Sequence, residues 1–215
     1  LSIRWIESKV NKYLNTLMGT ENEDFVVASD TDSIYLTLDS LVNLSFGRSL
    51  ETVEKEKVVD FLDKVCSEKL EPYIDDCYQE LADYMNAYDQ KMVMTRETIA
   101  SKGLWTAKKR YVLNVYNNEG VSYAEPKLKV MGLEAVKSST PEVCRDNIKK
   151  AISIIMTGTE DDMIDFIESF KTKFKNLSPE EVAFPRGVNG VKKYTQGNTY
   201  IKRTPIHVKG SIIYN

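Results

Sequence analysis

The stretch FVVASDTDSIYL, residues 25–36, is the part of this sequence that decides its fold. Two β-rich apolar runs, residues 25–29 and 33–38, flank Asp30-Thr31-Asp32, and such runs on either side of a short polar turn predict a β-hairpin. On an extended chain, residues two apart point to the same face about 6 to 7 Å apart. The hairpin therefore presents the carboxylates of Asp30 and Asp32 to one place.

Two carboxylates at a hairpin tip are typical of a magnesium site. Mg²⁺ prefers one or two carboxylates, with waters and substrate phosphates completing its shell. With two ions about 3.5 to 4 Å apart, one activates an attacking hydroxyl and the other steadies a leaving pyrophosphate, so no side-chain base is required. An Asp-x-Asp also occurs at turns for conformational reasons alone, because Asp tolerates turn geometry. The apolar strands on both sides of Asp30 and Asp32 favour the metal site.

Hydrophobic periodicity predicts helices around this hairpin. Apolar residues at helical spacing fill residues 2–18, and the run ends at Gly19. Residues 50–88 show a second helical pattern, with a break or kink expected near Pro72. Long helices are therefore expected to pack beside the hairpin.

Three strand-like runs follow, residues 91–99, 104–116 and 122–131. Asn117-Asn118-Glu119-Gly120 forms a turn between the second and the third. If residues 104–116 are one strand, Lys109 and Tyr111 share one face and Arg110 lies on the other. A basic-aromatic strand of this kind also occurs as an ordinary exposed edge.

The last third of the chain reads as mostly helical. Thr140 and Pro141 predict a helix start, as the cap and the first helical residue. Two helices follow, residues 141–157 and 159–177, and past Ser178 the chain becomes irregular and basic. The fold class is α+β, an antiparallel sheet with packed helices followed by a mostly helical segment.

Composition excludes several classes of protein. The 215 residues are 42% hydrophobic, and their longest apolar runs are short, so we expect no membrane span and a cytoplasmic location. The three cysteines are odd in number and lack close-pair spacing, which argues against a disulfide framework or a zinc site. The chain begins at Leu1 and stops at Asn215 just after an apolar pair, so both ends are expected to be cut from a longer chain.

The net charge of −3 hides an asymmetry along the chain. Residues 1–100 carry 10 Lys and Arg against 20 Asp and Glu, whereas residues 171–215 carry 9 against 2. This pattern suits a first half that holds metal and a second half that meets a polyanion. Two solvated faces of opposite sign would give the same balance.

Several motifs resemble, in the right order, those of the family B DNA polymerases, most closely those of T-even-type bacteriophages. Asp30-Thr31-Asp32-Ser33 resembles the third palm motif, usually written Tyr-Gly-Asp-Thr-Asp-Ser. Lys108-Lys109-Arg110-Tyr111 resembles the Lys-x-Tyr motif. The other matching segments are Trp5-Ile6-Glu7 and Lys9-Val10-Asn11, Thr95-Arg96-Glu97, Tyr123 to Lys127, Met131 to Glu134, and Ser138 to Pro141. The resemblance covers nearly the whole chain.

The resemblance implies roles for particular residues. Asp32 becomes a principal ligand of two catalytic Mg²⁺ ions, Asp30 its catalytic neighbour, and Glu97 a peripheral carboxylate. Lys109 and Tyr111 become contacts to the minor groove near the primer terminus, where acceptors shared by every base pair let an enzyme test pairing without reading sequence. The remaining residues that the resemblance places on DNA are Lys108, Arg110, Ser138, Ser139 and Thr140.

The resemblance also implies a division of the chain and its partners. Residues 1–132 would form the back of the palm and residues 133–215 the start of the thumb. The whole enzyme would transfer a nucleotide from dNTP to a primer 3′-hydroxyl on a template, in the host cytoplasm and without a membrane. The first palm aspartate motif, the fingers motif and the exonuclease carboxylates are nowhere in these residues, so we expect the chain alone not to polymerise. A sliding clamp would be reached only through a C-terminal segment that the chain lacks.

Some positions depart from the family pattern. Ala28 and Ser29 stand where the family often has Tyr and Gly, and Thr95 stands where relatives often have Asp. The segment between Ala100 and Trp105 is shorter than the glycine-rich loop of the phage relatives, so a DNA contact there is in doubt.

Three other functions remain open from the sequence. The chain could be a genuine subunit of a split polymerase that assembles with a separately encoded front half. A metal-dependent glycosyltransferase also uses Asp-x-Asp to hold a nucleotide diphosphate, but it leaves the Lys-Lys-Arg-Tyr run unexplained. A noncatalytic duplex-binding module would bind DNA without metal.

Overall fold

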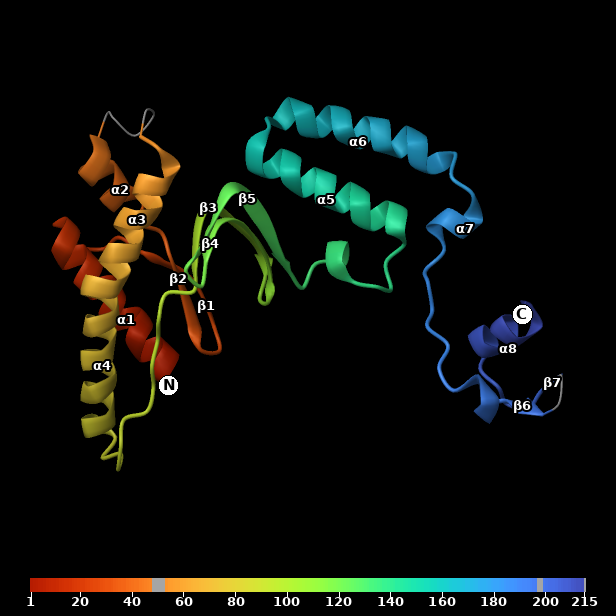
Figure 1. Cartoon of the computed structure of the whole chain (residues 1–215), viewed down its shortest axis with the longest axis horizontal. Helices are drawn as coiled ribbons and strands as arrows, with labels where there is room; N and C mark the ends of the chain where they lie inside the picture. The colour runs from red at the N-terminus through yellow and green to blue at the C-terminus, as the bar shows by residue number, and fades with distance from the viewer. Residues whose placement is uncertain (48–52, 197–198, 215) are drawn as a thin grey trace. The chain divides into compact units, whose positions relative to one another are not determined.

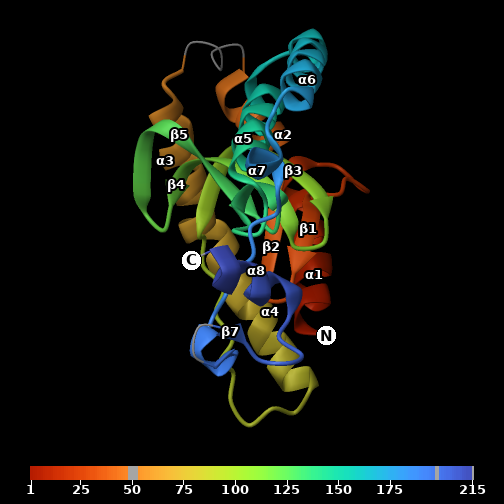
Figure 2. The ribbon, with the colours of Figure 1, turned by 90° about the vertical axis from the view of Figure 1, so that its right-hand side faces the viewer.

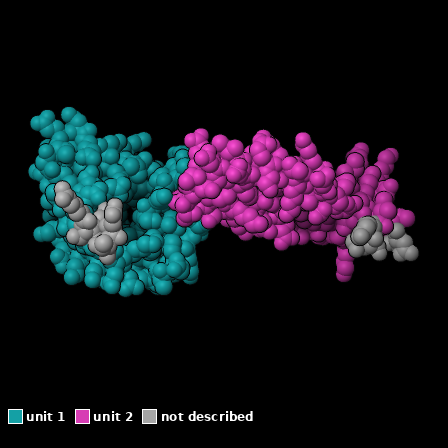
Figure 3. Space-filling model, turned by 90° about the horizontal axis from the view of Figure 1, so that it is seen from above, with its two compact units in different colours: residues 1–129 teal, residues 130–215 magenta. Residues whose placement is uncertain are grey.

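A computed structural model describes residues 1–47, 53–196 and 199–214 of the chain. The chain divides into two units, residues 1–129 and residues 130–215, coloured separately in Figure 3. Helices and small antiparallel sheets share the first unit, which confirms the α+β class. In the parts of the chain that the structure describes, no helix combines the length and apolar character needed to cross a bilayer.

Helix α1 (Ser2–Met18) forms where the periodicity predicts it. Gly19 ends the helix in the left-handed conformation at φ 67°, where its N–H reaches the carbonyl oxygens of Asn15 and Thr16. The buried face of α1 carries Ile6, Val10 and Leu14, all fully shielded from solvent. This face packs on strand β1 (Val26–Asp30) and on helix α4 (Glu71–Tyr84), as Figure 1 shows.

Two asparagines on α1 hold the chain that leads into β1. Asn11 Oδ1 accepts hydrogen bonds from the backbone N–H groups of Phe25 at 2.8 Å and Val26 at 3.0 Å. Asn15 Oδ1 accepts from the Glu23 N–H at 2.9 Å, and its Nδ2 donates to the Glu23 carbonyl at 2.8 Å. Buried backbone groups need such partners, so the two amides fix where the strand begins.

The predicted helix over residues 50–88 is observed in three consecutive parts. Leu50 lies outside the described residues, and helix α3 (Lys55–Val65) continues through a π-helical turn (Cys66–Leu70) into α4 without an interruption (Figure 1). The helix does not break at Pro72, which is the second residue of α4, but its winding changes just before Pro72, in the π turn, which agrees with the irregularity expected near this proline. The wider turn relieves the clash that a proline ring makes with the carbonyl four residues earlier.

The π turn also aligns two carboxylates. In an α-helix, which turns about 100° per residue, Asp63 and Glu71 would lie about 80° apart around the axis. The π turn adds about one residue to a turn and removes most of that offset. Both carboxylates consequently contact the same residue, Arg96, through its side chain and its backbone N–H.

A three-stranded antiparallel sheet follows, in the order β3 (Thr98–Ala107), β4 (Arg110–Asn118) and β5 (Val121–Met131), drawn in green in Figure 2. The prediction of a strand over 91–99 is wrong for residues 91–97, which join no sheet, although Met92 and Met94 pack against the core of the first unit as apolar residues should. The turn at 117–120 and the third strand are confirmed.

The predicted single strand over 104–116 is also wrong. A turn at Lys108 and Lys109 divides it, with Ala107 paired to Arg110 and Trp105 paired to Tyr111. Lys109 takes a positive φ of 62°, which a hairpin turn requires and which a non-glycine residue rarely adopts. Pairing between the long flanking strands selects this turn, because Lys-Lys itself carries no turn signal.

In the second unit, helices α5 (Glu142–Thr157) and α6 (Glu160–Lys175) pack on each other, and this confirms the predicted pair. Thr159 caps α6 through a reciprocal pair of bonds with Asp162. Pro141 is the residue before α5 rather than its first, and the expected Thr140 cap is wrong since no side chain caps this helix. The other elements are the 3₁₀ turns at Glu134–Val136 and Val191–Lys193, helices α7 (Pro179–Val182) and α8 (Ile206–Tyr214), and the short strands β6 (Thr195–Gln196) and β7 (Thr199–Tyr200).

We predict that Asn11→Leu lowers the free energy of unfolding by roughly 2 to 4 kcal/mol, because two buried N–H groups lose their acceptor. Urea unfolding followed by circular dichroism measures this loss. Asn43→Ala, on the exposed surface of α2 (Asp39–Phe46), is the control and should change little. An equal loss in both variants would contradict a specific role for Asn11.

Candidate metal and nucleic-acid site

The Asp-Thr-Asp segment forms the predicted hairpin between β1 and β2 (Ser33–Leu36). Asp30 pairs with Ser33, which leaves Thr31 and Asp32 as the two turn residues, with Thr31 at φ 53°. Asp32 is therefore not on an extended strand, and the expectation of a shared strand face does not describe it. The turn itself presents Asp30, whose side chain is 24% exposed, and the exposed Asp32 at one tip.

The tip of this hairpin lies next to the turn between β3 and β4. Lys109 Nζ is 3.9 Å from Asp30 Oδ1, and the lysine side chain remains 66% exposed. Lys109 reaches Asp30 from a turn rather than from a strand, so the expectation that it shares a strand face with Tyr111 is wrong. Lys108 is the exposed first residue of the same turn, and Arg110 begins β4.

Three aromatic rings join the two hairpins behind their tips. Tyr35 of β2 meets Trp105 of β3 edge-on, with ring centroids 5.3 Å apart, and Tyr111 of β4 at 5.4 Å. Trp105 and Tyr111 are 6.2 Å apart. We call these three residues the aromatic triad. Aromatic pairs at such separations attract one another beyond their buried area.

Electrostatics places Glu97 near the same site. Burial raises the pKa of Tyr111 well above its usual range, and a hydrogen bond with Tyr35 and the negative charges of Asp30 and Glu97 raise it further. The buried Tyr78 of α4 likewise has a raised pKa, because of burial and then the charges of Asp32 and Asp75. The two aspartates therefore act on different neighbours, Asp30 toward β4 and Asp32 toward α4.

Arg96, next to Glu97 in the chain, ties three elements together. Its guanidinium contacts Asp63 of α3 and Asn117 of β4, and its backbone N–H donates to Glu71 of α4 at 2.8 Å. The side chain is only 13% exposed. Arg96 therefore fixes the position of Glu97 relative to the sheet.

The tip has the ligand chemistry of a magnesium site. Two carboxylates with open sides leave room for the waters and phosphates that Mg²⁺ prefers. The Lys109 ammonium group, 3.9 Å from Asp30 Oδ1, shows that positive charge is accommodated at this tip. Within residues 1–47, 53–196 and 199–214, no three His, Cys, Asp or Glu side chains gather into a complete metal shell. The peripheral role of Glu97 stays a prediction.

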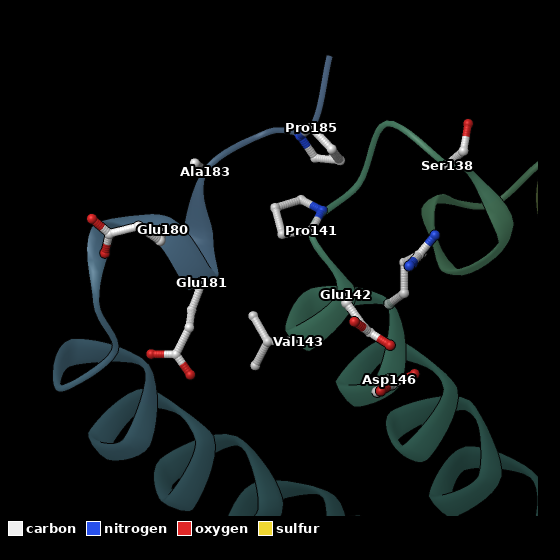
Figure 4. Close-up of a pocket in the computed structure, with 10 residues that line it drawn as sticks. Ser138, Pro141, Glu142, Val143, Asp146, Glu180, Glu181, Ala183 and Pro185 are labelled. Atoms are coloured by element: carbon white, nitrogen blue, oxygen red, sulfur yellow. The ribbon is translucent and has the colours of Figure 1, made fainter. Parts of the chain in front are cut away.

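The residues predicted to bind DNA in the second unit are only partly accessible. Ser138 and Ser139 are exposed, but Thr140 is 7% exposed. Ser138 lies at the edge of an open hollow of about 550 Å³ between the start of α5 and α7 (Figure 4). Glu142, Asp146, Glu180 and Glu181 line this hollow against one arginine, so its charge does not suit phosphates.

Sequence reasoning missed Arg96 as an anchor and the aromatic triad. Tyr35 stands in the Asp-Thr-Asp hairpin and Tyr111 in the Lys-Lys-Arg-Tyr motif, but nothing local predicts that their rings meet. The contacts of Arg96 bridge 33, 25 and 21 residues of chain, to Asp63, Glu71 and Asn117. No periodicity reports pairs so far apart.

Two proteins are similar to the chain along its whole length. The DNA-directed DNA polymerase of Escherichia phage RB69 is 41% identical over 223 aligned residues, which cover 100% of this chain and 24% of that polymerase. The DNA-directed DNA polymerase of Enterobacteria phage T4 is 36% identical over the same shares. The chain thus spans about a quarter of the length of these relatives. No family model matches the chain.

We predict that Arg96→Lys lowers the free energy of unfolding by about 2 kcal/mol, because the single ammonium nitrogen lacks the planar fork through which the guanidinium reaches Asp63 and Asn117 from two different nitrogens. Thermal or urea unfolding measures the loss. Arg4→Lys is the matched control, since Arg4 is exposed and its pair with Glu7 should contribute less than about 0.5 kcal/mol. If Arg96→Lys is as mild as the control, Arg96 is not an anchor.

Proposed function

Because the chain corresponds along its whole length to part of the family B DNA polymerases of T4-like phages, we propose that it supplies metal-binding and primer-binding parts of such an enzyme. Residues 1–132 form the back of the palm and residues 133–215 the start of the thumb. The complete enzyme transfers a nucleotide from dNTP to a primer 3′-hydroxyl, directed by a template. This activity needs the parts of the relatives that lie outside the matched quarter.

One observation supports the proposal above all others, the 3.9 Å approach of Lys109 to Asp30. It brings together two motifs to which the resemblance gives different roles: metal binding for the Asp30–Asp32 hairpin and primer contact for the Lys-Lys-Arg-Tyr turn. A polymerase needs these next to each other, because the primer terminus must lie beside the metal ions. A metal-dependent glycosyltransferase leaves this basic, aromatic-backed turn beside the Asp-x-Asp unexplained.

The chemistry divides among the described side chains. Asp30 and Asp32 would hold two Mg²⁺ ions, and bound ions would supply charge stabilisation for the attacking hydroxyl and the leaving pyrophosphate. Glu97 would be a peripheral carboxylate of this site. Lys109 and Tyr111 touch the minor groove at the primer end, where the acceptors shared by every base pair lie.

Further contacts lie outside this centre. Lys108 and Arg110 flank Lys109 and hold nearby phosphates. Ser138, Ser139 and Thr140 form the link through which the thumb meets the duplex, with Thr140 acting through its position rather than as an exposed donor. Primer-template DNA, dNTP and the rest of the polymerase are therefore the partners, in the host cytoplasm. A sliding clamp would bind elsewhere on the complete enzyme.

We predict that the chain binds a labelled primer-template duplex and that binding weakens as salt rises. Lys109→Ala should weaken binding about tenfold and equally for duplexes of different sequence, since the contacted minor-groove acceptors are shared by every base pair. Fluorescence anisotropy at several salt concentrations measures both effects.

Lys57→Ala is the matched control for this experiment. Lys57 lies in the same unit, and its side chain is 67% exposed, close to the 66% of Lys109. Equal weakening by both substitutions would reduce the effect to loss of general charge. Tight binding of a nucleotide sugar with no binding of DNA would favour the glycosyltransferase instead.

A second prediction tests catalysis. In a chimera of the phage RB69 polymerase whose matching segment is replaced by this chain, Asp32→Asn should reduce primer extension by at least about a thousandfold, because a metal ligand loses its charge. Asp39→Asn, an exposed aspartate on α2, is the control. Substantial extension by the Asp32 variant would exclude Asp32 as a principal metal ligand.

A further inference from the structure

Gly103 lies inside a strand, where its backbone conformation does not require glycine. It lies in β3 opposite Leu113 of β4, and its φ is not in the left-handed region that favours glycine. A glycine in a strand interior ordinarily weakens it, and it often marks a place where another group approaches closely. Gly103 should therefore be explained by what lies against it.

The group that lies against Gly103 is the ring of Trp105. A Cβ atom at position 103 would come within 2.5 Å of Trp105 Cζ3 and 2.6 Å of Cη2. Leu113 Cδ2 would be at 3.1 Å, so an added methyl group would also meet the side chain of Leu113 on β4. The indole ring of Trp105 thus lies in the space that a side chain at position 103 would fill.

Irregular pairing on both sides directs the indole into this space. The register of β3 with β4 shifts between Ala100 and Lys102 and again between Trp105 and Ala107. Such bulges re-aim side chains relative to a regular strand. Trp105 thereby folds back over Gly103 and reaches Tyr35 of β2 with its edge.

Tyr35 connects this packing to the proposed metal hairpin. Tyr35 lies in β2, a strand of only four residues, and pairs with Ala28 just before the tip. A two-stranded hairpin is marginal alone and takes its position from what packs on it. The aromatic triad supplies that contact on the side of Lys109.

We propose that Gly103 and Trp105 are positioning residues: the open space at Gly103 seats Trp105 against Tyr35 and Tyr111, and this holds the Asp30–Asp32 tip beside the Lys109 turn. The importance of that tip rests on the proposed function, but its position does not. Neither residue touches DNA, nucleotide or metal in this scheme. They act through Tyr35 and Tyr111.

Gly103→Ala tests the packing without DNA or metal, so the result is independent of the polymerase proposal. In a Trp5→Phe background Trp105 is the only tryptophan. The substitution should shift its fluorescence to longer wavelength and increase quenching by acrylamide. The amide NMR signals of Thr31, Asp32 and Ser33 should shift as well, because the hairpin loses its support.

Gly187→Ala is the matched control, since a Cβ at Gly187 meets no atom within 4 Å and its φ is likewise ordinary. It should change neither the fluorescence nor the hairpin signals. A change in Trp105 fluorescence without any shift at Thr31 to Ser33 would overturn the positioning role. No change in either would overturn the proposal entirely.

A second variant separates this specific clash from general damage. Trp105→Phe removes Cζ3 and Cη2, the two atoms that an alanine at 103 would meet. In that background Gly103→Ala should lower the melting temperature far less than it does beside Trp105. An equal loss in both backgrounds would mean that Trp105 does not occupy the space at Gly103.

Discussion

The amide groups of Asn11 and Asn15 set the position of everything that follows them in the first unit. Their bonds to the backbone of Glu23, Phe25 and Val26 attach an entering strand to the helix whose buried face packs on that strand. A hairpin of two short strands has too little apolar surface to locate itself. These hydrogen bonds fix the residue at which β1 begins. The apolar core under α1 then stabilises the strand in that position.

From this fixed start, the two hairpin tips meet through a balance of charge and packing. Carboxylates at a tip repel each other, and the Lys109 ammonium group offsets part of that repulsion. The aromatic triad packs the two hairpins together behind the tips. Arg96 performs the corresponding task farther along the sheet, where Asp63, Glu71 and Asn117 converge on it.

The sequence pattern predicted those elements whose formation depends on interactions between residues close together in the chain. Helix α1, the Asp-Thr-Asp hairpin and the pair α5 and α6 follow from periodicity and from turn or cap chemistry within a few residues. The Lys108-Lys109 turn escaped prediction because pairing between β3 and β4 imposes it against the preference of lysine. At the site, Asp30 and Lys109 stand in motifs that the sequence shows, but their contact depends on strand register, which one sequence does not reveal. Whether Asp30, Asp32 and Glu97 act on metal stays a prediction.

The π turn between α3 and α4 gives this region an unusual kind of constraint. Asp63 and Glu71 meet Arg96 because the chain between them holds one residue more than regular helical winding would use. Several side chains in that interval face solvent and are free to vary. Its length is not free, since losing or gaining a single residue would rotate α4 by about 100° relative to α3. This segment therefore tolerates substitutions at its exposed positions but not insertions or deletions.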